Sequence, residues 1–156
     1  MGEPNFTLGM DCKLYIGADL LALDNNAAQA DWSEAGNVKD LTLNLSTGEA
    51  DVTTRANAGW KATAATLKDA SIEFDMLWKP GDDLFDAIQE AWVASDEIAA
   101  AAMSGPIEGE GSAGQQGLAS NFCVTGFTRN EPLAEAVTVK VTLKPSSFTE
   151  WYKVGA

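Results

Sequence analysis

The segment from Thr47 to Asp69 (TGEADVTTRANAGWKATAATLKD) constrains the fold of this chain more than any other part. It is rich in threonine and alanine, poor in large apolar residues, and it joins two strongly patterned strands. A compact domain of 156 residues rarely contains so long a connection unless the connection has a function. Its pattern predicts a hairpin, with Ala50–Arg55 extended, a turn over Ala56–Gly59, and Trp60–Thr66 returning.

This hairpin is expected to need a surface outside itself. Two strands alone are marginally stable in water, and the large apolar residues of the segment are limited to Val52, Trp60 and Leu67. We therefore expect the hairpin to pack on another copy of the chain. Arg55 and Trp60 are the expected anchors, because both residue types concentrate in interface hot spots.

Strands on both sides of this segment carry the period-2 alternation of half-buried sheet. Leucines alternate with polar residues over Val38–Ser46, and apolar residues alternate with polar, mostly acidic ones over Ser71–Trp78. Apolar residues, mainly valine, alternate with threonine and lysine over Val137–Leu143, and this strand is expected to stop at Pro145. Further strands are expected at Cys12–Gly17, Ile98–Ser104 and Leu118–Arg129, with a bulge at Gly126 in the last of these.

One convincing helix is expected at Asp82–Ala94, where apolar residues recur at helical spacing and Asp82 or Asp83 can cap the N-terminus. Ala18–Gly36 is expected to be a loop with at most one helical turn, and Gly105–Gly117 a flexible glycine-rich loop. Because strands dominate without β-α-β alternation, the sequence predicts a mainly β single domain over 1–156. The expected fold is an antiparallel β-sandwich or barrel with one flanking helix and a long protruding hairpin arm over 47–69.

Composition excludes several functional classes. Ten basic against twenty-three acidic residues give a net charge of −13, which repels phosphate backbones and argues against a sequence-reading nucleic-acid binder. The absence of histidine removes the commonest general base and transition-metal ligand. No catalytic, phosphate-binding or calcium-binding motif is present, so no enzyme activity, metal or cofactor is expected. No secretory signal or membrane span is expected either.

Paired carboxylates are the remaining candidate for chemistry. Glu73 and Asp75 lie two residues apart on the polar face of a predicted strand, and Asn44 lies on the equivalent face of a neighbouring strand. Paired carboxylates are one arrangement that enzymes use for acid–base catalysis. The simpler interpretation is a hydrated acidic sheet surface.

The chain resembles the major tail protein, or tail tube protein, of long-tailed bacteriophages. The resemblance is carried by the stretch from Asn37 to Arg55 with the following Gly-Trp-Lys, the strand Ser71–Trp78, the helix, and the stretch from Val124 to Leu133. It covers roughly residues 12–146, and its most specific part is Asp-Val-Thr-Thr-Arg followed by Gly-Trp.

This resemblance implies that six subunits form a ring, that their sheets join into a barrel around a lumen, and that rings stack into a tube through which the genome leaves the capsid. It implies that the main partners of the chain are other copies of itself, and that the tape measure, tip and terminator proteins are further partners. Double-stranded DNA is expected to pass through without specific binding, and no membrane is expected to be involved. The implied location is the tail of the virion, assembled in the cytoplasm of the bacterial host. The expected contacts between subunits are Asp51, Val52, Thr53, Thr54, Arg55, Trp60, Lys61, Arg129 and Asn130, and the expected lumen residues are Asn44, Glu73 and Asp75.

Three alternatives remain at this point. Related tubes serve bacterial tail-like particles and secretion systems. A monomeric β-sandwich binding module could stack sugars on Trp32, Trp60 and Trp151. A hydrolase that uses Glu73 and Asp75 is the third alternative.

The Arg129–Pro132 stretch is expected to be a turn. It is expected to form either a surface hairpin with a local Arg–Glu contact or a contact between rings.

Overall fold

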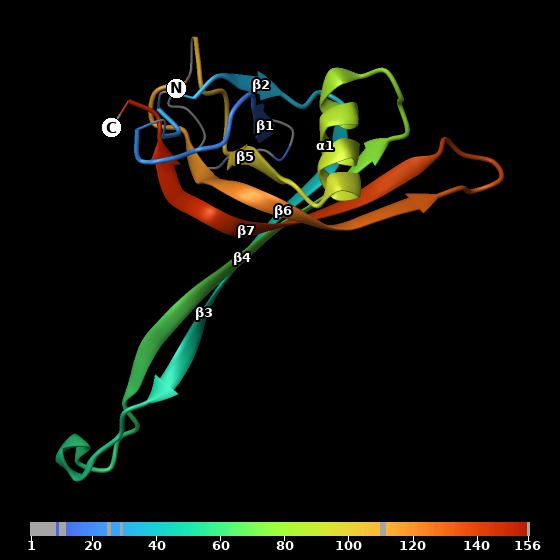
Figure 1. The fold of residues 1–156 in the computed structure, drawn as a ribbon. Helices are drawn as coiled ribbons and strands as arrows, with labels where there is room; N and C mark the ends of the chain where they lie inside the picture. The colour runs from blue at the N-terminus through green and yellow to red at the C-terminus, as the bar shows by residue number, and fades with distance from the viewer. Residues whose placement is uncertain (1–8, 10–11, 25, 29, 110–111, 156) are drawn as a thin grey trace, which may run out of the picture.

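The structure is a computed structural model that describes residues 9, 12–24, 26–28, 30–109 and 112–155. Its described residues form one antiparallel sheet of seven strands with the helix α1 (Asp83–Ala94) against it (Figure 1). The strands are β1 (Lys13–Gly17), β2 (Trp32–Glu34), β3 (Val38–Asp51), β4 (Thr63–Leu77), β5 (Glu97–Met103), β6 (Gln116–Asn130) and β7 (Thr138–Lys153). Their order across the sheet is β2-β1-β5-β6-β7-β4-β3. The predicted mainly β, antiparallel class with a flanking helix is confirmed.

The sheet is strongly rolled, because one core joins strands from its two ends. Leu14 of β1 and Phe74 of β4 belong to the same buried cluster as Phe85 and Ile88 of α1. The predicted inward face of β4 is confirmed, since Ile72, Phe74 and Met76 are buried and Trp78, just after the strand, packs partly buried against the same core. Burial of each such side chain stabilises the fold by roughly 1.5–3 kcal/mol.

The helix matches its predicted position, with one difference at its start. Asp82 is the N-cap residue, but its side chain makes no capping hydrogen bond. Phe85, Ile88 and Ala91 are buried as the helical spacing indicates. Trp92, predicted on the same stripe, is instead 47 % exposed, and its ring is stacked against Phe127 with centroids 6.1 Å apart. The stripe is therefore narrower than the sequence pattern indicates.

The alanine-rich strand β5 is buried on both faces. Ala100 and Ala102 belong to the core under α1, whereas Ala99 and Ala101 belong to a second cluster on the opposite face. Small side chains allow neighbouring strands to approach closely: a Cβ on Gly117 of β6 would lie 1.8 Å from the carbonyl oxygen of Ala102. Alanine is used here because of space, despite its low strand propensity.

The segment Ala18–Gly36 covers the second cluster. Its described residues are mostly loop without a helical turn, and they include the short strand β2, which the sequence did not predict. Asn121 of β6 fixes the segment, because its side-chain oxygen accepts from the Leu21 N–H at 2.7 Å and its amide donates to the Leu21 carbonyl at 2.8 Å. The loop is thus anchored to the sheet by a buried polar pair.

Strand β7 continues well beyond its predicted end at Pro145. Pro145 pairs with Phe122, and the next regular pair is Ser120 with Thr149, so the register shifts between them. Proline is compatible with this position because a bulge does not require its missing N–H. A second shift lies between Val124 and Gly126, which confirms the bulge predicted at Gly126.

The glycine-rich segment Gly105–Gly117 is mostly loop, and β6 begins near its end, at Gln116. Ile107 within it is buried in the second cluster, and its N–H donates to the Tyr15 hydroxyl at 3.3 Å. Residues 110 and 111 lie outside the described residues. The expected flexibility of this loop stays a prediction.

Candidate assembly interface

The β3–β4 hairpin extends far beyond the body of the molecule, and its outer part, Thr47–Asp69, is called the arm (Figure 1). Pairing between the two strands continues to Asp51 and Thr63, whereas β4 pairs with β7 only from Ile72 to Leu77. Beyond Ile72 toward the tip, no third strand among the described residues pairs with the hairpin. The predicted protruding hairpin is confirmed.

The arm is a continuation of two body strands. The alternation of apolar residues predicts strands that stop at Ser46 and restart at Ser71, but β3 runs to Asp51 and β4 begins at Thr63. Backbone pairing requires no particular side chain, so it continues where the large apolar residues stop. The end of alternation thus marks the end of burial and not the end of the strand.

No residue from 47 to 69 is buried. Its three large apolar side chains are largely in solvent: Val52 is 50 % exposed, Trp60 78 % and Leu67 86 %. A two-stranded ribbon with an exposed indole at its tip lacks the packing that stabilises independent sheets. The arm therefore exposes apolar surface that packing against another molecule would bury.

Polar contacts, rather than packing, give the arm tip its shape. The Asp51 carboxylate accepts from the Thr53 N–H at 2.9 Å, and the Thr53 hydroxyl accepts from the Ala62 N–H at 2.8 Å. The Asn57 side chain accepts from the Thr54 N–H at 2.6 Å, as part of a capping box. Hydrogen bonds from the Thr53 side chain, and then from its N–H, hold the pKa of the Asp51 carboxyl below its ordinary value of 3.8.

The tip also differs locally from the predicted turn. Arg55, expected to be extended, begins a single turn of 3-10 helix, η2 (Arg55–Asn57), which the left-handed Ala58 and Gly59 terminate. Arg55 and Trp60 are exposed, as is Lys61. Within the arm, the predicted contact residues thus fall into two groups. Asp51, Thr53 and Thr54 form the hydrogen bonds that shape the tip, whereas the side chains of the other predicted arm residues are available to a partner.

The β6–β7 hairpin forms a second projection (Figure 1). Arg129 and Asn130 were expected within a turn, but they end strand β6, and the turn follows them. The Arg129 Nε lies 2.7 Å from a Glu131 carboxylate oxygen, which confirms the predicted local contact, and its guanidinium carbon lies 4.9 Å from the Trp78 ring centroid. Arg129 is therefore already held within its own subunit, and its role between subunits stays a prediction.

The outward face of the sheet carries the residues predicted to line a lumen. Asn44 of β3 donates to the Ser71 hydroxyl at 3.3 Å, Glu73 of β4 lies between Thr42 and Thr142, and Asp75 lies opposite Lys140. The structure therefore brings the three predicted residues to one polar face. Their place at a lumen stays a prediction.

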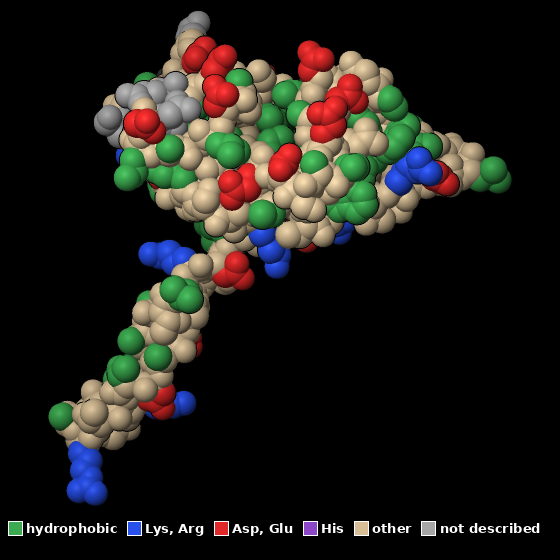
Figure 2. Space-filling view, in the orientation of Figure 1, with side chains coloured by type: hydrophobic (Ala, Val, Ile, Leu, Met, Phe, Trp, Pro, Cys, Tyr) green, Lys and Arg blue, Asp and Glu red, His purple; other side chains and the backbone are tan. Residues whose placement is uncertain are grey.

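Charge is distributed unevenly over the molecule. Figure 2 shows acidic side chains over the upper part of the body around α1, and basic side chains at the arm tip and along the underside. The sequence has the same asymmetry: no Lys or Arg lies between Pro80 and Thr128, whereas residues 52–68 of the arm contain three basic residues and no acidic one. The body around α1 is thus acidic, whereas the arm as a whole balances three basic residues against Glu49, Asp51 and Asp69 and has its positive charge toward the tip.

The features of the alternative functions are not brought together. Trp60 stands at the arm tip, away from the body that carries Trp32 and Trp151 (Figure 1), so the three indoles do not form one sugar-binding groove. The described residues contain no group of acidic or cysteine side chains arranged to hold a metal. None of the described helices is long and apolar enough to cross a membrane.

Solved structures share this fold at low sequence identity. The tail of an empty gene transfer agent particle, refined with C6 symmetry, aligns with a TM-score of 0.69 at 12 % identity, covering 94 % of this chain and 99 % of that one. The SPP1 tail tube aligns with a TM-score of 0.64 at 13 % identity, covering 94 % and 80 %. A chain of the anti-feeding prophage baseplate aligns over all of both chains, with a TM-score of 0.59 at 10 % identity.

The family comparison agrees with the fold. No curated protein matches the chain. The family model described as phage tail tube protein matches residues 17–147, which include the arm, both hairpins and the helix. Because this match spans most of the sequence, the chain belongs to the phage tail tube protein family.

Proposed function

We propose that six copies of this chain form a ring, and that rings stack into the tail tube through which a phage genome leaves the capsid. The observation that carries this proposal is the arm, in which no residue is buried in the single subunit. An exposed Trp60 together with Val52 and Leu67 provides apolar area that association removes from water. Family membership and the C6 symmetry of a structural relative support the same arrangement.

The sheet edge supports ring formation. Among the described residues β3 pairs with β4 alone, so its other edge presents unpaired N–H and C=O groups. Such edges invite pairing with another chain, and closure into a ring removes them. Joining the sheets of six subunits edge to edge gives a continuous barrel around a lumen.

The acidic character of the chain supports a conduit for DNA. We place Asn44, Glu73 and Asp75 at the lumen wall, on the outward polar face of β3 and β4. Carboxylates there repel the phosphate backbone, so DNA slides past without specific binding. Lys140, opposite Asp75, and Lys144 on the same face of β7 reduce this repulsion, so the face is not purely acidic.

The role is structural and requires no catalytic step or cofactor. Tape measure, tip and terminator proteins are the further partners of such a tube, and the tube assembles in the bacterial cytoplasm before it becomes part of the virion tail. A tube of a tail-like particle is the second candidate, since the anti-feeding prophage chain aligns over the full length of this one.

Removal of the arm tests the proposal. Replacing Ala50–Thr66 by an Asn-Gly turn should leave the body folded, because no residue of the segment is buried. Negative-stain electron microscopy should show rings and tubes for the wild type and soluble small species for the variant. Circular dichroism and thermal unfolding establish that the body of the variant is intact.

Serine at the small arm positions Ala64 and Ala65 provides the control, since it retains the arm and should assemble normally. Two outcomes contradict the proposal: a wild type that stays monomeric at high concentration, or an arm-deleted chain that forms tubes as readily as the wild type.

A further inference from the structure

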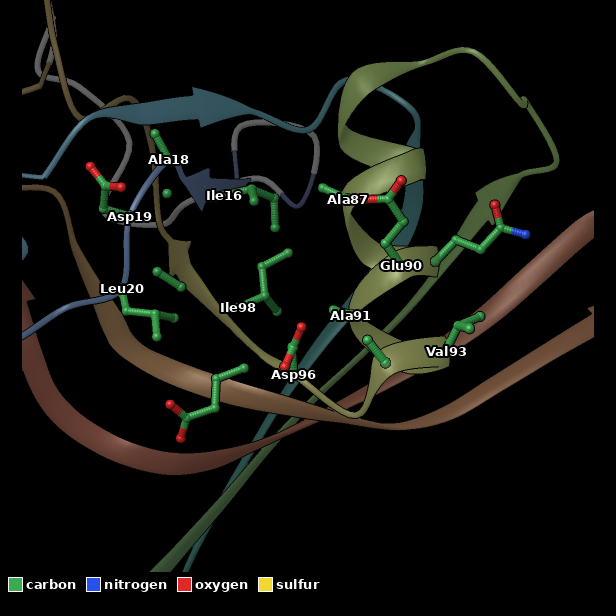
Figure 3. Close-up of a pocket in the computed structure, with 15 residues that line it drawn as sticks. Ile16, Ala18, Asp19, Leu20, Ala87, Glu90, Ala91, Val93, Asp96 and Ile98 are labelled. Atoms are coloured by element: carbon green, nitrogen blue, oxygen red, sulfur yellow. The ribbon is translucent and has the colours of Figure 1, made fainter.

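A groove lies between α1 and the segment that follows β1 (Figure 3). It has a volume of about 630 Å³ and is open to solvent. Ile16, Ala91 and Ile98 form part of its apolar floor, while Leu20 and Val93, which are 46 % and 70 % exposed, stand on its two sides. A volume of this size is within the range of sites that accept one or two large side chains.

The rim of the groove is acidic. Asp19, Glu90, Asp96 and Glu97 line it, and no basic residue does. The described part of the chain forms two ion pairs, Lys13 with Glu34 and Arg129 with Glu131, and neither includes a carboxylate of the rim. Glu97 accepts a hydrogen bond from the Ser146 hydroxyl. The groove therefore combines apolar surface with carboxylates that form no ion pair with the described residues of their own subunit.

The arm tip has the complementary chemistry. Arg55 and Lys61 share the arm tip with the 78 % exposed indole of Trp60, and they outnumber its one carboxylate, Asp51, which already accepts a hydrogen bond from the Thr53 N–H. Tryptophan and arginine are the residue types that most often provide the energy of an interface. A basic tip with an apolar centre matches an acidic rim with an apolar floor.

The position of the two surfaces determines which copy they can join. The arm leaves the body on the side opposite α1, so a subunit does not reach its own groove (Figure 1). A contact between different patches on opposite sides of the molecule is heterologous, and it propagates from copy to copy without closing a dimer. Such a contact either closes a ring or extends along an axis. Because ring closure is assigned above to the β3 edge, the arm contact is assigned to the stacking of rings.

We propose that the groove beside α1 is the acceptor site for the arm tip of a second copy in an adjacent ring. Trp60 enters the apolar part between Leu20 and Val93, and Arg55 and Lys61 meet Glu90 and Asp96. This assignment rests on the proposed stacking of rings, and it leaves the β3 edge for contacts within a ring.

Charge reversal tests the site in the full-length chain. We expect Arg55→Glu with Lys61→Glu, and separately Glu90→Lys with Asp96→Lys, to raise the concentration needed for tube formation by about tenfold, since each places like charges together. The chain with all four substitutions should form tubes near the wild-type concentration, because the pairs are restored with opposite sign. Sedimentation and electron microscopy measure assembly.

Matched controls carry the same charge change elsewhere. Lys79→Glu with Lys153→Glu corresponds to the arm variant, and Asp24→Lys with Glu108→Lys corresponds to the groove variant, all at exposed positions. Both controls should assemble normally. Equal loss in the controls would attribute the effect to net charge and overturn the assignment.

Cysteine cross-linking provides an independent measurement. In a chain with Cys12→Ser and Cys123→Ser, the pair Ala56→Cys and Val93→Cys should form disulfide-linked ladders in tubes, whereas Ala56→Cys with Leu133→Cys should not. If wild-type tubes form but no ladder appears and the fourfold variant is not rescued, the acceptor site is wrong while the tube function stands. A groove variant that builds normal tubes but fails to complete a tail would assign the groove to another tail protein and also overturn the inference. A wild type that forms no tubes contradicts the function itself.

Discussion

The body and the arm are built from the same two strands but stabilised in different ways. In the body, β4 places Ile72, Phe74 and Met76 in the core, and all three are nearly inaccessible to solvent. In the arm, the same strand continues with threonine, alanine and one exposed leucine, and nothing is buried. Backbone pairing alone is therefore enough to define the path of the arm but supplies little of the packing that stabilises the body.

This difference indicates how the arm can be shaped for docking without a packed core of its own. The arm tip is preorganised by hydrogen bonds of Asp51, Thr53 and Thr54, so little order remains to be gained on docking. Its large apolar side chains are few, and charged residues are interspersed with them along the chain. A neighbour can then supply the missing burial at modest entropic cost.

The largest expected effect separates the two regions along one strand. Phe74→Ala should lower the free energy of unfolding by about 3–5 kcal/mol, because it leaves a cavity in the main core. Leu67→Ala on the arm, the matched control, should change it by less than about 0.5 kcal/mol. Urea unfolding of the dilute, unassembled chain measures both. Similar losses for the two variants would mean that the arm is packed in the free subunit.

The next effect is on assembly. Trp60→Ala should leave the unfolding free energy unchanged within about 0.5 kcal/mol. It should raise the concentration needed for tube formation by roughly 30-fold, which corresponds to the 2 kcal/mol of an interface hot spot. Trp60→Phe keeps an aromatic side chain and should lose less. An alanine variant that assembles like the wild type would remove the indole from the interface.

Sequence patterns predicted the faces of the central strands because those strands are half-buried. The alternation around Phe74 therefore gave the correct inward face, and the helix was found from its apolar stripe. Alternation did not predict two features. One is the burial of β5 on both faces, where Ala99 and Ala100 lie in different clusters, although a strand was expected there; the other is the last part of β7, which continues past Pro145 across a register shift. Neither two-sided burial nor a bulge produces a period-2 signal.

The arm could be located from the sequence because its composition is poor in large apolar residues. Its proposed acceptor site could not be located in this way. The groove joins Asp19 with Glu90 and Asp96, which are distant in the chain and meet only through folding. The absence of Lys and Arg from Pro80 to Thr128 was a visible signal of an acidic surface. The proposed partner of that surface becomes apparent only when the arm tip, with Arg55 and Lys61, is seen on the opposite side.

The polar sheet face provides a comparison of smaller expected effect. Glu73→Lys with Asp75→Lys should change stability little, since both side chains are only half-buried. If this face lines the lumen, variant tubes should retain short double-stranded DNA at low salt and release it as salt rises, whereas wild-type tubes should not retain it. Asp24→Lys with Glu108→Lys is the control of equal charge. Equal retention by the control would place Glu73 and Asp75 away from the lumen.

The smallest expected effect concerns the arm tip itself. Because hydrogen bonds from Thr53 lower the folded-state pKa of Asp51 below 3.8, the ionised form stabilises the tip. This stabilisation is fully present above the unfolded value and is lost as pH falls through the lowered folded value. An NMR titration of the Asp51 carboxyl carbon should therefore show a midpoint below 3.8.

Two variants at Thr53 separate the sources of this shift. Thr53→Val removes the hydroxyl and should move the Asp51 pKa toward 3.8, whereas Thr53→Ser retains the hydroxyl and should leave the pKa lowered. If the midpoint in the wild type equals the ordinary value, the tip is not ordered by these bonds in the free subunit. The arm would then acquire its shape only on docking, and the preorganisation that distinguishes it from a disordered loop would be absent.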